Sequence, residues 1–314
     1  MRKLFLMSLV LMAFAGGAGP ALAAPDVTLP DARYPEGPLW HDGKLLFTEM
    51  SRDRVALWDG TNVSPFWRKR GCGPTAIVTF REQDFVILCH LGGYLVHVDA
   101  TGGKIERFDK DEAGQPLHDP NDATTDGEGG LYFSDAGVFR HGAPATGAIL
   151  HLDRNGRLRR LAAHLYYANG VFFDAPSRRL FVSEHLARRV LIFDVAGNGA
   201  LENKRVFADL NRDGPPLRWQ YAESGPDGLE LDREGVLWVC EYGQGRVLAF
   251  DKGGRLRGQV LLATPYLTNI AFSADARVAL TGAFSNTRSP FPGEVRILPF
   301  ALLRQSAAAS LEPR

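Results

Sequence analysis

The sequence lacks the features that would place it in several common classes of protein. It has only three cysteines, and none lies in a Cys-x-x-Cys or Cys/His metal-binding spacing. Lysine plus arginine and aspartate plus glutamate both number 36, and no block of one sign is long. Because nucleic-acid and membrane-surface proteins carry a basic face, we expect neither kind of partner. No obligatory protein partner is indicated either.

Sequence signatures of two familiar enzyme classes are also missing. There is no Gly-x-Ser-x-Gly motif, which argues against a classical serine hydrolase. The run Gly243-Gln244-Gly245 is interpreted as a turn, because no helix follows as in a dinucleotide-binding fingerprint. No amphipathic helix of useful length is apparent, so the pattern favours an all-β chain.

A long apolar run occurs only at the N-terminus. Arg2 and Lys3 precede the run Leu4 to Ala15, and Ala21-Leu22-Ala23 resembles a cleavage site. We therefore predict a signal peptide over residues 1–23 and an exported chain, periplasmic or secreted, without a membrane span after cleavage.

The three cysteines have different surroundings in the sequence. In an oxidising compartment Cys72 and Cys89 are able to pair, but the sequence leaves this open. Cys240 lies in a hydrophobic strand and is interpreted as a small buried residue.

One unit of sequence recurs six times. Each copy has an apolar strand, a turn with Asp, Gly or Asn, a second strand, a Gly-rich or charged turn, and a third strand that ends near Asp. The fifth copy runs from Ser224 to Asp251. A period of roughly 40–60 residues with three or four short strands predicts a six-bladed β-propeller, here a single domain over residues 24–314. We expect a strand near Asp26 to Leu29 to complete the last blade and close the ring.

The first strand of each blade lines the central channel of a propeller, so residues at the same position of the repeat converge there. This position holds Glu36, Thr75, Asn121, Asn169, Asp227 and Asn269. Carboxylates and carboxamides facing one narrow channel are costly to bury without partners. A hard cation would remove this cost, and the oxygen ligands favour Ca²⁺ or Mg²⁺. The alternative is that Asn-Gly and Asp-Gly form turns that tie the blades together without a metal.

With these motifs in order, the sequence resembles the gluconolactonase/regucalcin (senescence-marker protein) family of six-bladed propellers, which is related to diisopropylfluorophosphatase. The fragments that carry the resemblance are Pro35-Glu36-Gly37-Pro38-Leu39-Trp40, Pro120-Asn121-Asp122, Asn169-Gly170, Gly225-Pro226-Asp227-Gly228 and Thr268-Asn269-Ile270-Ala271-Phe272. Each fragment is weak alone, but their order and spacing are specific.

The resemblance implies a metal site formed by Glu36, Asn169 and Asp227, with Asn121 near both the metal and the substrate. The implied ion is Ca²⁺, with Mg²⁺, Mn²⁺ and Zn²⁺ as alternatives. The chain departs from the family at Asp119, where bacterial lactonases of this type often have serine and the regucalcin type has arginine. A carboxylate there disfavours anionic substrates.

These observations lead to a hypothesis of metal-dependent hydrolysis of a small lactone, sugar or other. Asp227 would act as general base, although its metal coordination makes a metal-bound water, or direct attack by Asp227, an alternative. Substrate-binding residues are predicted to be Asn121, Asp119, Trp219, Glu241 and His185. Two other readings stay open: a non-catalytic binding propeller with a structural ion, and a phosphotriesterase-like hydrolase that uses the same site.

Overall fold

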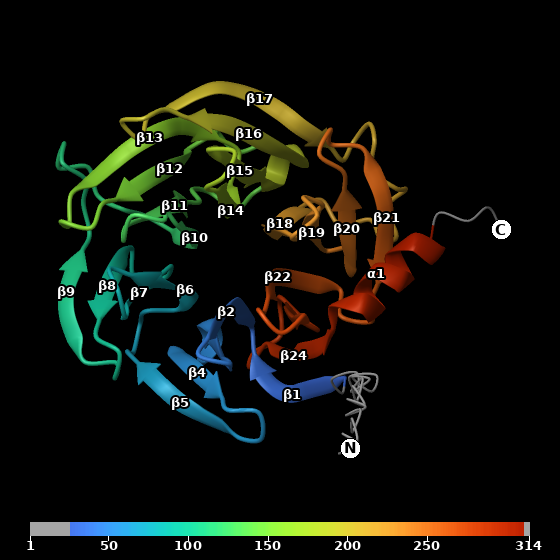
Figure 1. The fold of residues 1–314 in the computed structure, drawn as a ribbon, viewed down its shortest axis with the longest axis horizontal. Coiled ribbons are helices and arrows are strands. Elements are labelled where there is room, and N and C mark those ends of the chain that lie inside the picture. Colours follow the sequence, from blue (N-terminus) through green and yellow to red (C-terminus); the bar gives the residue numbers. More distant parts are fainter. Residues whose placement is uncertain (1–25, 311–314) are drawn as a thin grey trace, which may run out of the picture.

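The computed structural model describes residues 26–310, which form six four-stranded antiparallel sheets around a central channel (Figure 1). In five sheets the strands follow chain order from the channel to the rim. The prediction of an all-β, six-bladed propeller is confirmed.

The strands of the first three blades are β2 (Pro35–His41), β3 (Lys44–Glu49), β4 (Arg54–Trp58), β5 (Val63–Arg68); β6 (Pro74–Phe80), β7 (Asp84–Cys89), β8 (Tyr94–Val98), β9 (Lys104–Phe108); β10 (Pro120–Thr125), β11 (Leu131–Asp135), β12 (Gly147–Leu152) and β13 (Leu158–Leu165). The strands of the other three are β14 (Ala168–Asp174), β15 (Arg179–Glu184), β16 (Arg189–Val195), β17 (Leu201–Asp209); β18 (Gly225–Leu231), β19 (Leu237–Tyr242), β20 (Arg246–Phe250), β21 (Leu256–Leu261); β22 (Tyr266–Phe272), β23 (Arg277–Ala283), β24 (Pro292–Pro299) and β1 (Val27–Arg33).

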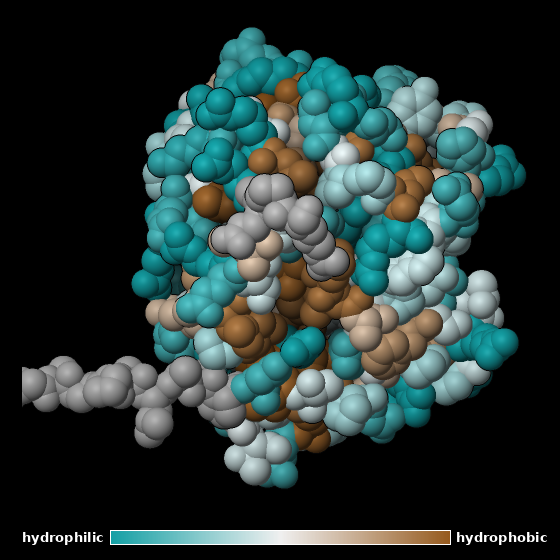
Figure 2. Space-filling view, turned by 90° about the vertical axis from the view of Figure 1, so that its right-hand side faces the viewer, coloured by the Kyte–Doolittle hydropathy of each residue, from teal (hydrophilic) through white to brown (hydrophobic). Residues whose placement is uncertain are grey.

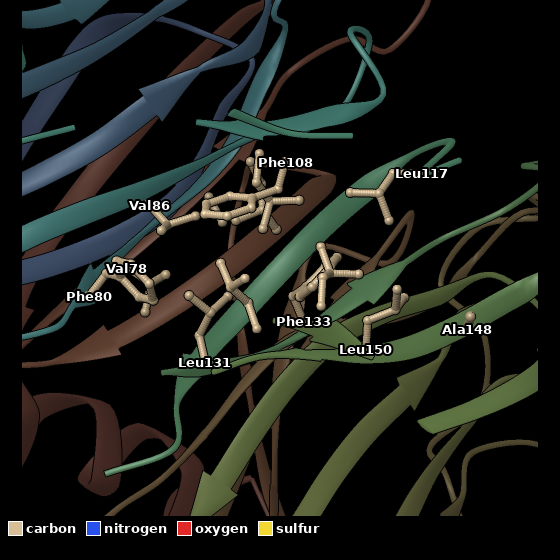
Figure 3. Close-up of a cluster of buried hydrophobic side chains, with 14 residues drawn as sticks. Val78, Phe80, Val86, Phe108, Leu117, Leu131, Phe133, Ala148 and Leu150 are labelled. Carbon is tan, nitrogen blue, oxygen red and sulfur yellow. The ribbon is translucent and has the colours of Figure 1, made fainter. Parts of the chain in front are cut away.

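The hydrophobic core lies between the blades. The second strand of a blade is covered on both faces by its neighbours, so it is a continuous apolar run, as in β7. The rim strand β9 is largely exposed and correspondingly polar. Figure 3 shows one interblade cluster, in which Val78, Phe80 and Val86 of the second blade face Leu131 and Phe133 of the third.

The two ends of the chain share one blade. β1 pairs antiparallel with β24, with Val27 opposite Ile297 and Arg33 opposite Pro292. This pairing confirms the predicted closing strand. It completes the four strands of the sixth blade and ties the N-terminal segment to the C-terminal one.

One helix was not predicted. α1 (Phe300–Ala309) follows β24 and buries Leu303 and Ala307 against the fifth and sixth blades, and Phe300 packs on Trp238 with ring centroids 5.7 Å apart. Figure 2 views this flank of the molecule and shows hydrophobic residues gathered between hydrophilic ones. The helix is only 10 residues long and ends in small residues, so its apolar periodicity is weak.

A disulfide joins Cys72, in the loop before β6, to Cys89 at the end of β7, and Cys240 is a buried free thiol. The structure thus forms the pairing that the sequence left open. The predicted signal peptide falls outside the described residues. Within residues 26–310, no helix has the length and apolar character needed to cross a bilayer.

Candidate active site in the central channel

A β-bulge interrupts the first strand of every blade near the position that carries the recurring polar residue. The register shifts at Pro74/Ala76 in β6, Pro120/Ala123 in β10, and correspondingly in the other first strands. A bulge bends the strand and re-aims its side chains. The polar residues therefore turn toward the channel axis at the point where each strand begins.

The glycine that follows several of these residues has a steric cause. A Cβ on Gly170 would lie 2.2 Å from the main-chain oxygen of Asp227, and one on Gly228 would lie 2.1 Å from Oδ1 of Asn269. Adjacent first strands approach so closely around the channel that no side chain fits. The Asn-Gly and Asp-Gly pairs thus reflect the packing of the channel as well as turn preference.

A cavity of about 190 Å³ opens at this end of the channel. Its wall consists of Tyr34, Glu36, Met50, Thr75, His90, Asn121, Phe139, Tyr167, Asn169, His185, Asp227 and Tyr242. The structure therefore brings the four predicted ligands Glu36, Asn121, Asn169 and Asp227 into one cavity. The sixth residue of the set, Asn269, instead donates to Oδ1 of Asp122 below the cavity, at 3.2 Å.

The two cavity carboxyl groups are buried without a cationic partner on the wall. Glu36 is 7% exposed and Asp227 is 4% exposed, and none of the described residues that line the cavity is a lysine or an arginine. Burial raises the pKa of Glu36 well above its ordinary value, and the charges of Asp227 and Asp122 raise it further. Burial also raises the pKa of Asp227, ahead of the charge of Asp122. Both groups need either a proton or a cation.

The donor set fits a hard divalent cation. Two carboxylates and two carboxamides supply only oxygen ligands, and the cation would supply the missing positive charge. Across residues 26–310 there is no cluster of three or more His, Cys, Asp or Glu placed to hold a metal, so a site here depends on the amide oxygens as well.

The second blade contributes a polar side to the cavity. Nδ1 of His90 is buried and has no hydrogen-bond partner. Asp119 lies next to this wall, and burial raises its pKa while the neighbouring His90 opposes the shift. Oδ1 of Asp135 accepts hydrogen bonds from the main-chain N–H groups of His118 (3.1 Å) and Asp119 (2.7 Å), which fixes the loop that carries Asp119.

The opposite side of the cavity is aromatic. The ring of Phe139, from the loop after β11, lies 4.8 Å from Tyr167, 5.5 Å from His185 and 6.2 Å from Tyr242. The hydroxyl groups of Tyr34 and Tyr242 are 2.8 Å apart and share a hydrogen bond. Sequence reasoning predicted His185 on this wall but missed Phe139 and Tyr167. The one signal for Phe139 was the length of the turn at residues 136–146, longer than the turns after the other second strands.

His185 lies on the wall as predicted. Its Nδ1 is 3.1 Å from the carbonyl oxygen of Pro226 and its Nε2 is 2.8 Å from that of Glu223. Burial lowers the pKa of His185 to about 4, so the ring is neutral at pH 7.

The structure does not bring Glu241 and Trp219 to the cavity wall, which corrects their predicted role in substrate binding. Glu241 is fully buried and paired with Nε of Arg246 at 2.5 Å and Nη2 of Arg188 at 2.7 Å. The same pair of Glu and Arg, five residues apart, recurs as Glu49–Arg54 and Glu184–Arg189, so it is part of the repeat. Trp219 stacks under the guanidinium of Arg218, 4.3 Å away, on the loop before β18.

Comparison with known proteins places the fold and the site in context. The family model for the SMP-30/Gluconolactonase/LRE-like region matches residues 34–281 of this chain. An L-arabinolactonase from Azospirillum brasilense is 26% identical over 259 residues, which is 79% of this chain and 80% of the relative.

Two solved structures are also similar. A gluconolactonase from Xanthomonas campestris has 26% identity and a TM-score of 0.70, with 87% of this chain and 89% of that chain covered. A calcium-binding protein, regucalcin, from Agrobacterium tumefaciens has 19% identity and a TM-score of 0.69, with 85% and 90% covered, which shows a shared fold.

Proposed function

The chain belongs to the SMP-30/gluconolactonase/LRE-like family, and on this premise we propose that it is a metal-dependent hydrolase that opens a small lactone in the channel cavity. One observation carries the proposal: Glu36 and Asp227 are buried together with Asn121 and Asn169 in one cavity, on a wall without lysine or arginine. The names of the arabinolactonase and gluconolactonase relatives support the same reaction class.

Glu36, Asn169 and Asp227 would hold the ion, with Asn121 beside it, and Ca²⁺ is the proposed ion because every donor is an oxygen. When bound, a divalent ion polarises the lactone carbonyl as a Lewis acid. The two carboxylates would then keep their charge at neutral pH, because the ion reverses the effect of burial on their pKa.

The residues of the chain have separate parts in ring opening. Asp227 accepts a proton from a water molecule, and the water oxygen bonds to the carbonyl carbon. The bond from that carbon to the ring oxygen then breaks, and the ring oxygen takes up the proton held by Asp227 to give a hydroxy acid. Asn121 orients the lactone. Burial raises the pKa of Tyr167 above its ordinary value, so its hydroxyl stays protonated and available as a donor.

Direct attack by Asp227 on the carbonyl is the alternative to its acting on water. A single turnover in ¹⁸O-labelled water distinguishes the two routes, because attack by water places the label in the first product formed. Attack by Asp227 forms a mixed anhydride. When water then attacks the Asp227 carbon of this anhydride, the first product carries an unlabelled oxygen from Asp227 and the label stays on Asp227.

We also propose that the chain is exported. A disulfide between Cys72 and Cys89 supports this proposal, because disulfides persist mainly in oxidising compartments. Detection of the mature protein in a periplasmic or culture-medium fraction, with its N-terminus near residue 24, is the direct test.

The decisive experiment measures hydrolysis of a panel of lactones by Ca²⁺-loaded and chelator-treated protein. We expect turnover only in the loaded protein and a loss on the order of 10³-fold in kcat in Asp227→Asn, because the base and an ion ligand are both impaired. Glu230→Gln is the matched control, since Glu230 is a channel carboxyl away from the cavity. If no lactone is opened while Ca²⁺ still raises the melting temperature, the protein is either a hydrolase of another substrate class or a binding propeller.

A further inference from the structure

The loops around the cavity opening carry most of the exposed large apolar side chains of the described residues. First strands begin and second strands end at this opening, as in the pairing of Gly225 with Tyr242. The loops before first strands and after second strands therefore surround it. Exposed side chains on these loops include Leu91, Val138, Phe139, Tyr166, Leu217 and Phe284. Apolar exposure gathered at one opening indicates contact with an apolar ligand.

The aromatic wall continues from the cavity into this opening. Tyr242 contacts Tyr221 and Tyr266, with ring centroids 6.2 Å and 5.0 Å away, and Tyr34 contacts Phe291 at 6.0 Å. Together with Phe139 these rings come from several blades and form one connected surface. An apolar group that passes from the cavity to the mouth would remain in contact with aromatic faces along its length.

Several polar atoms of the wall already form hydrogen bonds within the protein. The hydroxyls of Tyr34 and Tyr242 bond to each other, Oγ1 of Thr75 donates to the carbonyl oxygen of Pro120 at 3.2 Å, and both ring nitrogens of His185 lie against carbonyl oxygens. At the mouth, Nδ2 of Asn286 donates to the hydroxyl of Tyr221 at 2.6 Å. A ligand with many hydroxyls would have to share these atoms with their partners in the protein.

Within residues 26–310, three buried side-chain atoms have no hydrogen-bond partner, and of these only Nδ1 of His90 belongs to the cavity wall. With the Glu36, Asn169 and Asp227 set reserved for the ion, Asn121 and Tyr167 are the wall residues that supply polar contacts to the ester of the ring. A polyhydroxylated ring would need further hydrogen-bond partners along its length, whereas the side of the wall around Phe139 is aromatic.

We infer that the substrate is a neutral lactone whose ring carries a hydrocarbon substituent, and that this substituent lies against Phe139 and Tyr242 and extends into the apolar mouth. The inference rests on the proposed function and defines its substrate class. It sets this site apart from one built for a sugar lactone, which needs hydrogen-bond partners along the ring. The absence of lysine and arginine from the wall also disfavours an anionic substituent.

The test compares three six-membered lactones with Ca²⁺-loaded protein: δ-valerolactone, δ-decalactone with its pentyl chain, and glucono-1,5-lactone. We expect kcat/KM for δ-decalactone to exceed that for the unsubstituted ring by roughly tenfold or more, and glucono-1,5-lactone to be the poorest. Equal or faster opening of glucono-1,5-lactone would overturn the inference and leave the proposed function intact.

Phe139→Ala tests the wall directly. We expect it to lower the ratio of kcat/KM for δ-decalactone over δ-valerolactone by roughly tenfold, mainly through KM, whereas Phe139→Leu keeps most of the preference. Ile105→Ala is the control, because Ile105 is also an exposed apolar residue, 52% exposed against 40% for Phe139, and lies on β9, away from the mouth. An unchanged ratio in Phe139→Ala would remove this ring from the binding surface.

A binding assay without turnover separates the two proposals. The matching lactams, unsubstituted, pentyl-substituted and polyhydroxylated, are titrated against the protein by calorimetry. Tighter binding of the pentyl lactam in a protein that opens no lactone would keep the ligand class and reject the hydrolase. If no lactam binds and no lactone is opened, both proposals fail.

Discussion

At the cavity end of the channel, Glu36 and Asp227 face an open volume of about 190 Å³. At the other end, Asp122 and Glu230 line a second opening of about 280 Å³. Burial raises the pKa of Asp122 to about 6 and that of Glu230 to about 8, so a raised pKa does not distinguish the two ends.

The second end differs in that its carboxyls accept hydrogen bonds from main-chain N–H groups of other blades. Asp122 accepts from the main-chain N–H of Val171 at 3.0 Å and from Nδ2 of Asn269 at 3.2 Å, and Glu230 accepts from the main-chain N–H of Phe272 at 2.9 Å. Each donor belongs to another blade, so these carboxyls join blades across the channel. The sequence allowed an alternative in which all the channel residues tie the blades together without a metal. That role applies at this end of the channel.

The largest expected difference between the two ends concerns ion binding. We predict that Glu36→Gln lowers Ca²⁺ affinity by roughly 100-fold, because one ligand charge is lost from the cavity. Asp122→Asn should change the affinity much less, since its carboxyl faces the other opening. Calorimetric titration and the shift of the melting temperature by Ca²⁺ measure both. Equal losses in the two variants would mean that the channel acts as a single acidic site.

The stability of the fold should depend more on Asp122 than on Glu36, which is the reverse of the order expected for Ca²⁺ affinity. We predict that Asp122→Ala lowers the free energy of unfolding by about 2 kcal/mol, because the N–H of Val171 and the amide of Asn269 are left unpaired in a buried place. Glu36→Ala should be neutral or stabilising in the absence of Ca²⁺, since it removes a buried carboxyl that has no cationic partner on the wall. Denaturant titrations in chelator provide the values, and a large loss in Glu36→Ala would contradict the comparison.

The fold and the four polar residues of the cavity were accessible from the sequence because the repeat places them. Each blade has the same bulged first strand, so Glu36, Asn121, Asn169 and Asp227 reach one point by symmetry although they are far apart in the chain. The steric need for Gly170 and Gly228 gives the same positions a second signature in the sequence.

Phe139 of the aromatic wall and the structural role of Glu241 could not be predicted from the repeat in this way. Phe139 lies on a long turn, whose path depends on contacts with the next blades and has no counterpart in the repeat. Glu241 looked like a pocket residue because it is charged and ends a strand beside the opening. Its partners Arg188 and Arg246 come from two blades, and only the recurrence of Glu49–Arg54 and Glu184–Arg189 in the sequence indicated a structural pair.

The smallest expected effect concerns Glu230 and pH. Its pKa in the folded protein, about 8, is above its ordinary value of 4.5 because of burial and the charge of Asp122, so folding favours the protonated carboxyl. Its contribution to stability is therefore complete below pH 4.5 and is lost as the pH rises toward 8. We predict that Glu230→Gln becomes more stable relative to the wild type as the pH rises from 5 to 9, and that the trend levels off above 8.

Urea titrations across this range, with chelator present, measure the difference in unfolding free energy between the two proteins. The contributions of Glu36 and Asp227 are shared by both proteins and cancel in this difference. A difference independent of pH would show that Glu230 is ionised in the folded state, and the two ends of the channel would then differ in charge as well as in hydrogen bonding.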